Sequence, residues 1–562
     1  MSVSLPMSPS RVSSLVAALA ISSLAACAPA SAPSTAPAPV APTAPARPVA
    51  PPAVSLPESP VNWQLKDLAA DGIAGTGAER AHRELLAGRQ PGRTVVVAVI
   101  DGGIDTAHVD LRSVLWQNEK ERGGNGVDDD NNGYADDVRG WNFIGGANGA
   151  NVHHDTFELT RLYAACATAR RNGATNGTVN GADCAKVTEA YGEKRAEITG
   201  TLQQIDNIGR AMDNAVRVLK TAITGDVNKQ TVTALTSTNP QVNQARQLFL
   251  QLDENGLSPA VIAEAREAYG NQAKFGLDTL FDPRATVGDN YANGEERRYG
   301  NSDIAGPDAK HGTHVAGIIA AVRGNGIGLD GVANGVRIMG LRAVPDGDER
   351  DKDVANAIRY AVDNGAHIIN MSFGKGWSPN KPLVDAAVRY AESKGVLLVH
   401  AAGNDGEDID VTPNFPNAVL ADGTRARLWI EVGASSWKGG TEVAASFSNY
   451  GKTRVDLFAP GADIYSTVPG GEYARESGTS MAAPVVSGVA ALLMAYYPEL
   501  TAADVREILM ASVTKLGDVT VQPPGAPPTA RVKFGELSVT GGIVNAYDAV
   551  KMAEARRAAR RQ

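Results

Sequence analysis

Three short segments of the sequence carry an aspartate, a histidine and a serine in an order that suits nucleophilic catalysis. Asp101 ends the apolar run 95–101, His311 opens a run of small and apolar residues, and Ser480 follows a Gly-Thr pair. A serine hydroxyl is a weak nucleophile unless a base accepts its proton, and a carboxylate holds that base in the right tautomer. Asp–His–Ser is one of the chain orders in which this triad occurs. Each residue alone could be a turn former, a core histidine or a helix cap, but together they predict a catalytic serine.

The surrounding residues indicate the elements that would hold these side chains. A continuous apolar run such as 95–101 is typical of a parallel strand buried on both faces, and chemistry in open α/β sheets collects at the carboxyl ends of such strands. Small and apolar residues follow both His311 and Ser480, as in buried helices. A serine at the start of a helix lies beside unpaired N–H groups and the positive end of the helix dipole, which suit a developing oxyanion. The sequence thus predicts an α/β fold built on a parallel sheet.

Five motifs resemble those of the subtilisin-like serine peptidases, the subtilases, in the family's order. They are Val99-Ile-Asp-Gly-Gly103, His311-Gly-Thr-His-Val-Ala-Gly317, Ile369-Asn-Met-Ser-Phe-Gly374, Ala401-Ala-Gly-Asn404 and Gly478-Thr-Ser-Met-Ala-Ala-Pro484. The resemblance covers residues 60–150 and 290–553 and implies a subtilisin-like parallel sheet flanked by helices. The chain departs from the family at Gly102, where Ser or Thr is usual, and this removes a hydroxyl near Asp101.

The resemblance also implies roles for individual residues. Ser480 would be the nucleophile, His311 the base and then the acid, and Asp101 the group that orients His311. We expect His311 rather than His314 to be catalytic, because the family uses the first histidine of this pair. Asn404 matches the family's side-chain donor to the oxyanion, with the backbone N–H of Ser480 as its partner.

The reaction that this resemblance implies is peptide-bond hydrolysis through an acyl-enzyme. The expected protein is an endopeptidase that acts on proteins or peptides and needs no cofactor for catalysis. Transfer of the acyl group to an amine, as in a transpeptidase or macrocyclase, is an alternative outcome of the same chemistry. A non-catalytic binding or scaffold protein of the cell envelope is a further alternative, although a scaffold gains nothing from keeping the triad together with Asn404.

Candidate substrate-binding residues lie in three places: Ser372, Phe373 and Gly374 in one family motif, Asp348 and Asp351 in an acidic loop, and Asp405 directly after Asn404. In the family, the acidic loop borders the pockets for substrate residues that precede the scissile bond. Carboxylates at these edges predict a preference for basic side chains. A solvated loop with balanced charge is the alternative for Asp348 and Asp351, since Arg350 and Lys352 lie among them.

The composition describes a large globular chain without the features of a nucleic-acid-binding protein. Its 562 residues are 43% hydrophobic and 20% charged, and the net charge is −9. This length is enough for several domains. No basic patch interleaved with aromatic residues is visible, so the sequence argues against nucleic acid as a partner.

The N-terminus indicates export and a lipid anchor. Arg11 precedes an apolar stretch that is too short to span a bilayer, and the stretch ends in Leu24-Ala-Ala-Cys27, which resembles a bacterial lipobox. Residues 1–26 are therefore predicted to be a lipoprotein signal peptide, with Cys27 lipidated and residues 27–58 forming a linker rich in Pro and Ala. Ala28 favours the outer membrane of the cell envelope, with the protein facing the periplasm or the cell surface. A soluble secreted protein with an incidental cysteine is the alternative.

An Asp- and Asn-rich segment predicts a structural calcium site. Asp128, Asp130, Asn132 and Asp136 fall at offsets 1, 3, 5 and 9 of a calcium loop. Arg139 occupies the position of the twelfth-residue glutamate, so a complete EF-hand is excluded. Hard oxygen ligands favour calcium over a transition metal, and a polar, Gly-rich surface turn is the alternative.

The long separation of Asp101 from His311 indicates an insertion in the catalytic domain. Apolar residues recur at three- and four-residue steps from 198 to 223, as in an amphipathic helix. Cys166 and Cys184 are expected to form a disulfide in an oxidising compartment. The predicted domains are a catalytic domain in two parts (59–150 and 290–553), a helical insertion (151–289) and a basic tail (554–562). The lead-in 59–94 leaves no room for a separate pro-domain, so we expect folding without one. The insertion could gate the cleft, bind a partner or dimerise.

Overall fold

A nine-stranded sheet lies at the centre of the main body of the protein. The computed structural model describes residues 58–173 and 177–561, so the predicted signal peptide, Cys27 and nearly all of the linker lie outside the described residues. In spatial order the strands are β12 (Thr514–Lys515), β15 (Gly542–Ile543), β9 (Leu457–Pro460), β8 (Trp429–Ser435), β7 (Leu397–Ala401), β6 (Ile368–Met371), β1 (Val95–Asp101), β5 (Val336–Arg342) and β2 (Gly140–Asn142).

The sheet is parallel except where β12 pairs with β15. Strand β1 lies between β5 and β6 and is buried along almost its whole length, which explains its continuous apolar sequence. Its last residue, Asp101, is in register with Arg342 at the end of β5. The predicted α/β class with a parallel sheet is therefore confirmed.

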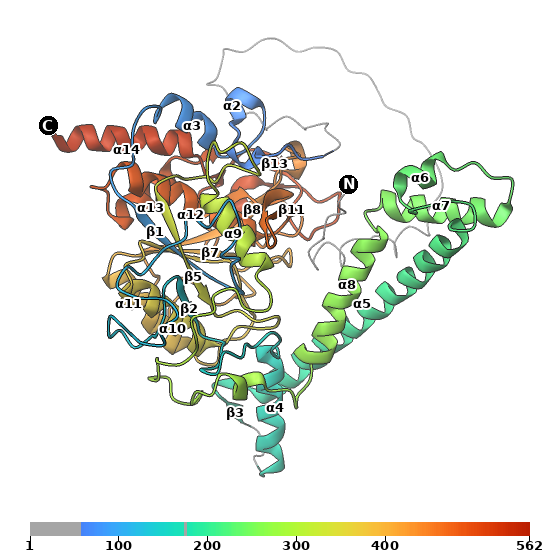
Figure 1. Cartoon of the computed structure of the whole chain (residues 1–562), viewed down its shortest axis with the longest axis horizontal. Coiled ribbons are helices and arrows are strands. Elements are labelled where there is room, and N and C mark those ends of the chain that lie inside the picture. Colours follow the sequence, from blue (N-terminus) through green and yellow to red (C-terminus); the bar gives the residue numbers. More distant parts are fainter. Residues whose placement is uncertain (1–57, 174–176, 562) are drawn as a thin grey trace, which may run out of the picture.

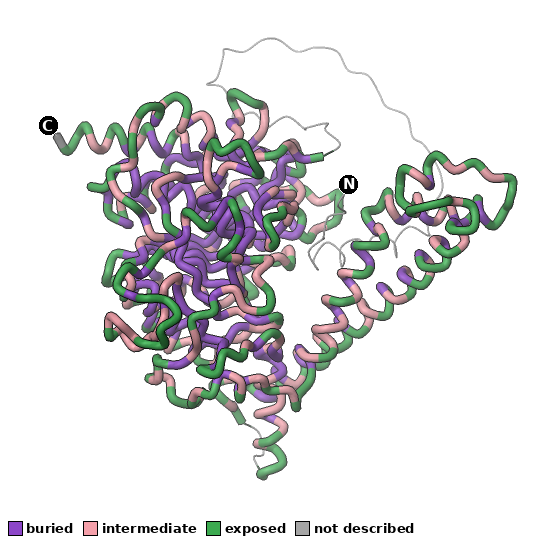
Figure 2. The backbone as a smooth tube through the Cα atoms, in the orientation of Figure 1, coloured by how far each residue is buried: buried purple, intermediate pink, exposed green. Residues whose placement is uncertain are grey.

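Helices cover both faces of the sheet (Figure 1). One face is covered by α3 (Ala78–Glu84), α9 (Lys310–Ala320), α12 (Thr479–Tyr496), α13 (Ala502–Ala511) and α14 (Ala546–Arg561). The other face is covered by α10 (Asp351–Asp363) and α11 (Lys381–Ser393). Figure 2 shows the buried residues concentrated along the sheet and these helices. Within the described ranges, α12 is the one helix long and apolar enough to cross a membrane, but its residues are buried in the core of the domain.

Smaller elements complete the main body. Trp63 and Leu65 of the N-terminal lead-in are buried in the core, so this segment packs as part of the domain. The remaining elements are η1 (Trp63–Leu65), α2 (Leu68–Asp71), η3 (Pro283–Thr286), η4 (Gly440–Glu442), η5 (Phe534–Glu536) and the strand pairs β10 (Ile464–Val468) with β11 (Glu472–Glu476) and β13 (Thr520–Val521) with β14 (Val532–Lys533).

Between β2 and α9 the chain leaves the sheet and forms a helical unit with its own apolar core. The elements are α4 (Glu158–Arg171), β3 (Thr178–Val179), β4 (Ala182–Asp183), α5 (Cys184–Leu219), α6 (Lys229–Ala234), α7 (Pro240–Glu254), α8 (Pro259–Asn271) and η2 (Gln272–Gly276). Figure 1 shows α5 and α8 side by side, projecting from the main body, with α6 and α7 at their far end. The expected disulfide between Cys166 and Cys184 is present and joins α4 to the start of α5, with a Cα–Cα distance of 5.6 Å.

The basic C-terminal residues are not a separate tail. Helix α14 continues through the predicted boundary at 553/554 as far as Arg561. Arg556 and Arg560 form ion pairs with Asp504 on α13, at 2.8 and 3.0 Å. These arginines extend helix α14, which packs against α13.

Candidate active site

Asp101 and His311 form a hydrogen-bonded pair at the carboxyl end of β1. Asp101 is the last residue of β1, and His311 is the second residue of α9. His311 Nδ1 lies 2.9 Å from Asp101 Oδ1 and 3.0 Å from Oδ2. The Asp101 carboxylate is buried, and it also accepts a hydrogen bond from the backbone N–H of Gly102 at 2.7 Å. An Nδ1–H that donates to Asp101 leaves Nε2 of His311 free to accept a proton.

The electrostatic surroundings of the two histidines of this helix shift their pKa values in opposite directions. Burial lowers the pKa of His311, but the negative charge of Asp101 and its hydrogen bond outweigh this and hold the pKa above its ordinary value. His314 is completely buried, and its Nε2 lies 3.0 Å from the carbonyl oxygen of Ile464. Burial lowers the pKa of His314 to about 3. His314 is therefore a neutral core histidine, whereas His311 is placed to act as a base.

Ser480 lies at the second residue of α12, where helix N–H groups have no partner within the helix. Its hydroxyl donates to the backbone carbonyl of Ser372 at 3.1 Å. The proton must therefore turn from this carbonyl toward His311 before attack, and such reorientation is common when no substrate is bound. Ser480 itself is half-buried.

Asn404 is oriented by the residue that precedes the nucleophile. The backbone N–H and the hydroxyl of Thr479 donate to Asn404 Oδ1, at 2.8 and 3.1 Å. A backbone N–H can only donate, so the atom that faces it must be the amide oxygen. Asn404 Nδ2 is then left to donate elsewhere, beside the N-terminus of α12. This arrangement matches the donor pair that the resemblance implied for an oxyanion.

A comparison with known families agrees with this geometry. A family model described as the subtilase family matches residues 92–524. The chain belongs to the subtilase family.

Several proteins are similar to this subtilase. The thermophilic serine proteinase of Bacillus sp. (strain AK1) is 44% identical over 184 residues, which make up 33% of this chain and 42% of that protein. Subtilisin BL of Lederbergia lenta is 38% identical over 213 residues, covering 38% of this chain and 72% of that protein. A solved structure of proteases from Pseudoalteromonas arctica matches with 20% identity and a TM-score of 0.45. The match covers 88% of this chain and 98% of the chain in that structure. The chain thus spans less than half the length of the first of these relatives.

A pocket of about 250 Å³ adjoins the Asp101–His311 pair in this subtilase. Its lining includes Ser372 and also His153, which comes from the start of the insertion. His153 could not be placed here from the sequence, because 158 residues separate it from His311 and the two segments meet only through packing. The insertion therefore contributes directly to the surroundings of the catalytic pair.

The family motif 369–374 lies beside Ser480, as expected from the resemblance. Ser372 is buried and bonded to the Ser480 backbone, while Phe373 is half-buried and packs against the core below α10 and α11. Gly374 is exposed, and a Cβ at this position would lie 2.6 Å from the amide of Asn414. Close packing by Asn414 therefore requires glycine at residue 374.

The predicted acidic edge of the substrate pockets is wrong for Asp348 and Asp351. Asp351 is 2% exposed, and its carboxylate pairs with Lys375 at 2.9 Å. Asp348 accepts a hydrogen bond from the backbone N–H of Glu158, at the start of α4. The insertion uses the Asp348 carboxylate, and the segment after β6 uses that of Asp351, so neither is free to attract a substrate. Asp405 is exposed directly after Asn404, as the sequence suggested.

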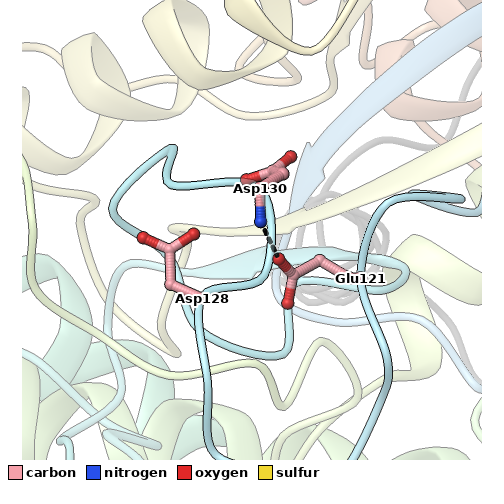
Figure 3. A group of neighbouring side chains, drawn as sticks. All are labelled: Glu121, Asp128 and Asp130. Carbon is pink, nitrogen blue, oxygen red and sulfur yellow. Dashed lines mark hydrogen bonds between the residues drawn. The ribbon is translucent and has the colours of Figure 1, made fainter.

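The structure brings together a different set of calcium-ligand candidates from the one that the sequence predicted. Carboxylate oxygens of Glu121, Asp128 and Asp130 lie within 4.8 Å of one another (Figure 3). Asp136 is not part of this group, and its two oxygens accept hydrogen bonds from the backbone N–H groups of residues 125 and 126. The Asn132 side chain donates through Nδ2 to the carboxylate of Asp137, and its Oδ1 accepts a hydrogen bond from the backbone N–H of Tyr134.

Glu121 was missed because it lies seven residues before Asp128, outside the alternating pattern. Its oxygens accept the backbone N–H groups of Asp130 and Asp136, and these bonds fold the loop back onto it. Three hard carboxylate donors are a fitting set for calcium.

Proposed function

We propose that this subtilase is a serine endopeptidase that hydrolyses peptide bonds through an acyl-enzyme formed on Ser480. The observation that carries the proposal is the hydrogen-bonded Asp101–His311 pair at the end of β1. The nucleophile at the N-terminus of α12 and the orientation of Asn404 support it. Its substrates are proteins or peptides, in keeping with the relatives that are named as proteinases and subtilisins.

Each group has a defined part in this reaction. His311 Nε2 accepts the Ser480 proton as Oγ bonds to the carbonyl carbon of the peptide. The oxyanion receives hydrogen bonds from Asn404 Nδ2 and from the backbone N–H of Ser480. The carbon–nitrogen bond then breaks as His311 gives its proton to the leaving amine. Water, deprotonated by His311, attacks the ester and releases the acid and Ser480.

The test is covalent labelling of the purified full chain in detergent with a fluorescent fluorophosphonate. Label is expected on the wild type and not on Ser480→Ala, because only an activated serine reacts. Digestion of a fluorescent casein should depend on the same residue, and mass spectrometry of peptide products should show hydrolysis at internal bonds. Equal labelling of the wild type and Ser480→Ala would overturn the proposal. Products joined to an added amine rather than to water would instead support acyl transfer.

A structural calcium ion is proposed at Glu121, Asp128 and Asp130. These side chains supply hard oxygen donors, and Asn118 donates to Asp130 at 3.1 Å, which holds that carboxylate in place. The ion would neutralise repulsion among three carboxylates and so stabilise the loop between β1 and β2. It has no part in the chemistry at Ser480.

A lipid anchor at Cys27 is proposed for the N-terminus. The support is the sequence alone, namely the lipobox-like segment 24–27 and the Pro- and Ala-rich residues that follow it. We propose an outer-membrane lipoprotein in which the linker holds the enzyme away from the membrane. Metabolic labelling with palmitate should mark the wild type and not Cys27→Ser, and membrane fractionation should place only the wild type with the outer membrane. Release of both proteins into the medium would contradict the anchor.

A further inference from the structure

The paired helices of the insertion stand beside the active site. We call residues 184–271, which contain α5 to α8, the helical arm. The residues that follow the arm are held against the main body, because the Phe275 ring stacks on the His154 ring at 4.2 Å and His154 Nδ1 lies 2.8 Å from Asp346 Oδ2. Figure 1 shows the arm diverging from the main body as it extends toward α6 and α7.

One ion-pair cluster joins the arm to the rim of the active site. Lys310 Nζ lies 3.6 Å from Glu264 Oε1 on α8 and 3.0 Å from Glu476 Oε1 at the end of β11. Lys310 directly precedes His311, and Glu476 is four residues before Ser480. The cluster thus bridges the segments that present the base and the nucleophile, and the arm supplies its third member.

The position of the cluster indicates which part of a substrate would meet it. His311 gives a proton to the leaving amine, so the residues that follow the scissile bond begin beside His311. The charge of Glu476 is close enough to contribute to the raised pKa of His311. Substrate residues that leave the catalytic centre on this side therefore pass Lys310, Glu476 and Glu264.

The cluster carries an excess of negative charge that solvent and substrate can reach. Two carboxylates share one ammonium group, and the side chains of Lys310 and Glu264 are 41% and 38% exposed. Glu476 is 14% exposed, and its buried Oε1 pairs with the Lys310 ammonium at 3.0 Å. Burial raises the pKa of Glu264, and Glu476 adds to this effect although Lys310 opposes it. A second cation at this place would satisfy both carboxylates.

We infer that Glu264 of the helical arm and Glu476 together bind a lysine or arginine side chain in the substrate residues that follow the scissile bond. This inference rests on the proposed peptidase activity and adds a determinant of its specificity. The arm is then part of the substrate-binding surface, because without α8 only one of the two carboxylates would remain. Attraction at such a partly exposed rim acts on substrate capture and is screened by salt.

The test measures kcat/KM for internally quenched peptides that differ only in the two residues after the scissile bond. Peptides with Arg, Ala or Glu at these positions are compared, and the wild type should prefer Arg. Glu264→Gln should reduce the Arg-to-Ala ratio about threefold, the scale of a partly exposed ion pair. Glu267→Gln is the matched control, since Glu267 is an exposed glutamate one turn away on the same helix, and its ratio should stay that of the wild type. The difference in this ratio between the wild type and Glu264→Gln should be smaller in 1 M salt.

A second variant should change the Arg-to-Ala ratio of kcat/KM in the opposite direction. Lys310→Met removes the competing ammonium, so the Arg-to-Ala ratio should rise about threefold, an effect that a merely structural contact of the arm would not produce. Equal shifts in Glu264→Gln and Glu267→Gln, or no shift in Glu264→Gln, would overturn the inference while cleavage of the Ala peptide leaves the proposed function intact. If the wild type cleaves none of the peptides, the proposed function fails, and the inference fails with it.

Discussion

Ser372 and Ser480 exchange two hydrogen bonds, each hydroxyl donating to the backbone carbonyl of the other residue, at 2.9 and 3.1 Å. The carbonyl of Ser480 is free to accept because Pro484, four residues along α12, has no N–H to donate to it. Asn370 in turn donates to the Ser372 hydroxyl at 2.9 Å. A side chain that follows β6 thus replaces the missing helical bond and fixes the backbone of the nucleophile.

Replacing Ser372 by alanine should impair both stability and catalysis. The Ser480 carbonyl would lose its donor, which costs about 1–3 kcal/mol for a buried group. We expect kcat to fall about tenfold, because small displacements of a catalytic group are costly. Urea unfolding and peptide cleavage measure the two effects. Ser512→Ala is the matched control, since Ser512 is buried and its hydroxyl has no hydrogen-bond partner among the described residues. A loss of kcat no larger than in this control would contradict the role of Ser372.

Replacing Asn404 by alanine should lower kcat about 10²- to 10³-fold with little change in KM, the range known for this donor in subtilisin. Asn404→Asp separates two explanations. The aspartate can still accept the hydrogen bond from Thr479 N, but it has no N–H to give an oxyanion. Steady-state kinetics should therefore show a loss in Asn404→Asp at least as large as in Asn404→Ala. Retained activity in the aspartate variant would mean that Asn404 only supports the loop.

The pH dependence of kcat/KM should report on the Asp101–His311 pair. Burial lowers the pKa of His311, but the opposing effect of Asp101 is larger, so the pKa lies above its ordinary value. The enzyme is active only when His311 is neutral. In Asp101→Asn the raising effect is lost, so the acid limb of the profile should move to lower pH. The plateau should fall roughly 10³- to 10⁴-fold, since His311 loses its orienting carboxylate. An acid limb at the same pH in both proteins would show that Asp101 does not control this pKa.

Removal of calcium should lower the melting temperature if the proposed site binds it. A ligand at one hundred times its Kd stabilises the folded state by about 2.7 kcal/mol. Scanning calorimetry with millimolar calcium or with EGTA should show this difference in the wild type and not in Glu121→Gln. Asn132→Ala should keep the calcium response, because the structure leaves Asn132 outside the cluster. Loss of the response in Asn132→Ala alone would favour the loop that the sequence suggested.

The buried His314 should make the fold sensitive to acid. Burial lowers its pKa in the folded state to about 3, whereas an unfolded histidine titrates near its ordinary value. The unfolded state therefore takes up a proton first as the pH falls through about 6.5, and stability is lost by about 1.4 kcal/mol per pH unit. His314→Gln keeps an N–H donor for the Ile464 carbonyl but cannot titrate. The free energy of unfolding should decrease less between pH 6 and pH 4 in this variant than in the wild type. Equal decreases would contradict the role of His314 in this acid sensitivity.

The sequence by itself determined the parts of this subtilase that depend on short segments. The apolar run 95–101 has to be a buried strand, and a carboxylate at its end has to lie at the edge of the sheet where helices begin. His311 and Ser480 occupy helix starts for the same local reason. Cys166 and Cys184 flank one Gly- and Asn-rich segment, and the expectation of a disulfide rested on the oxidising compartment that the N-terminus indicates.

Only the tertiary structure decided which distant groups meet, because such contacts depend on how the loops and the insertion pack. Asp351 looked like a free carboxylate until Lys375, from the next strand connection, was brought against it. Glu121 entered the calcium cluster through hydrogen bonds that fold a loop back on itself. Glu264 on α8 pairs with Lys310 on α9, although 46 residues separate them in the sequence. Burial and ion pairing are properties of the assembled fold, and no local pattern of residue types encodes them.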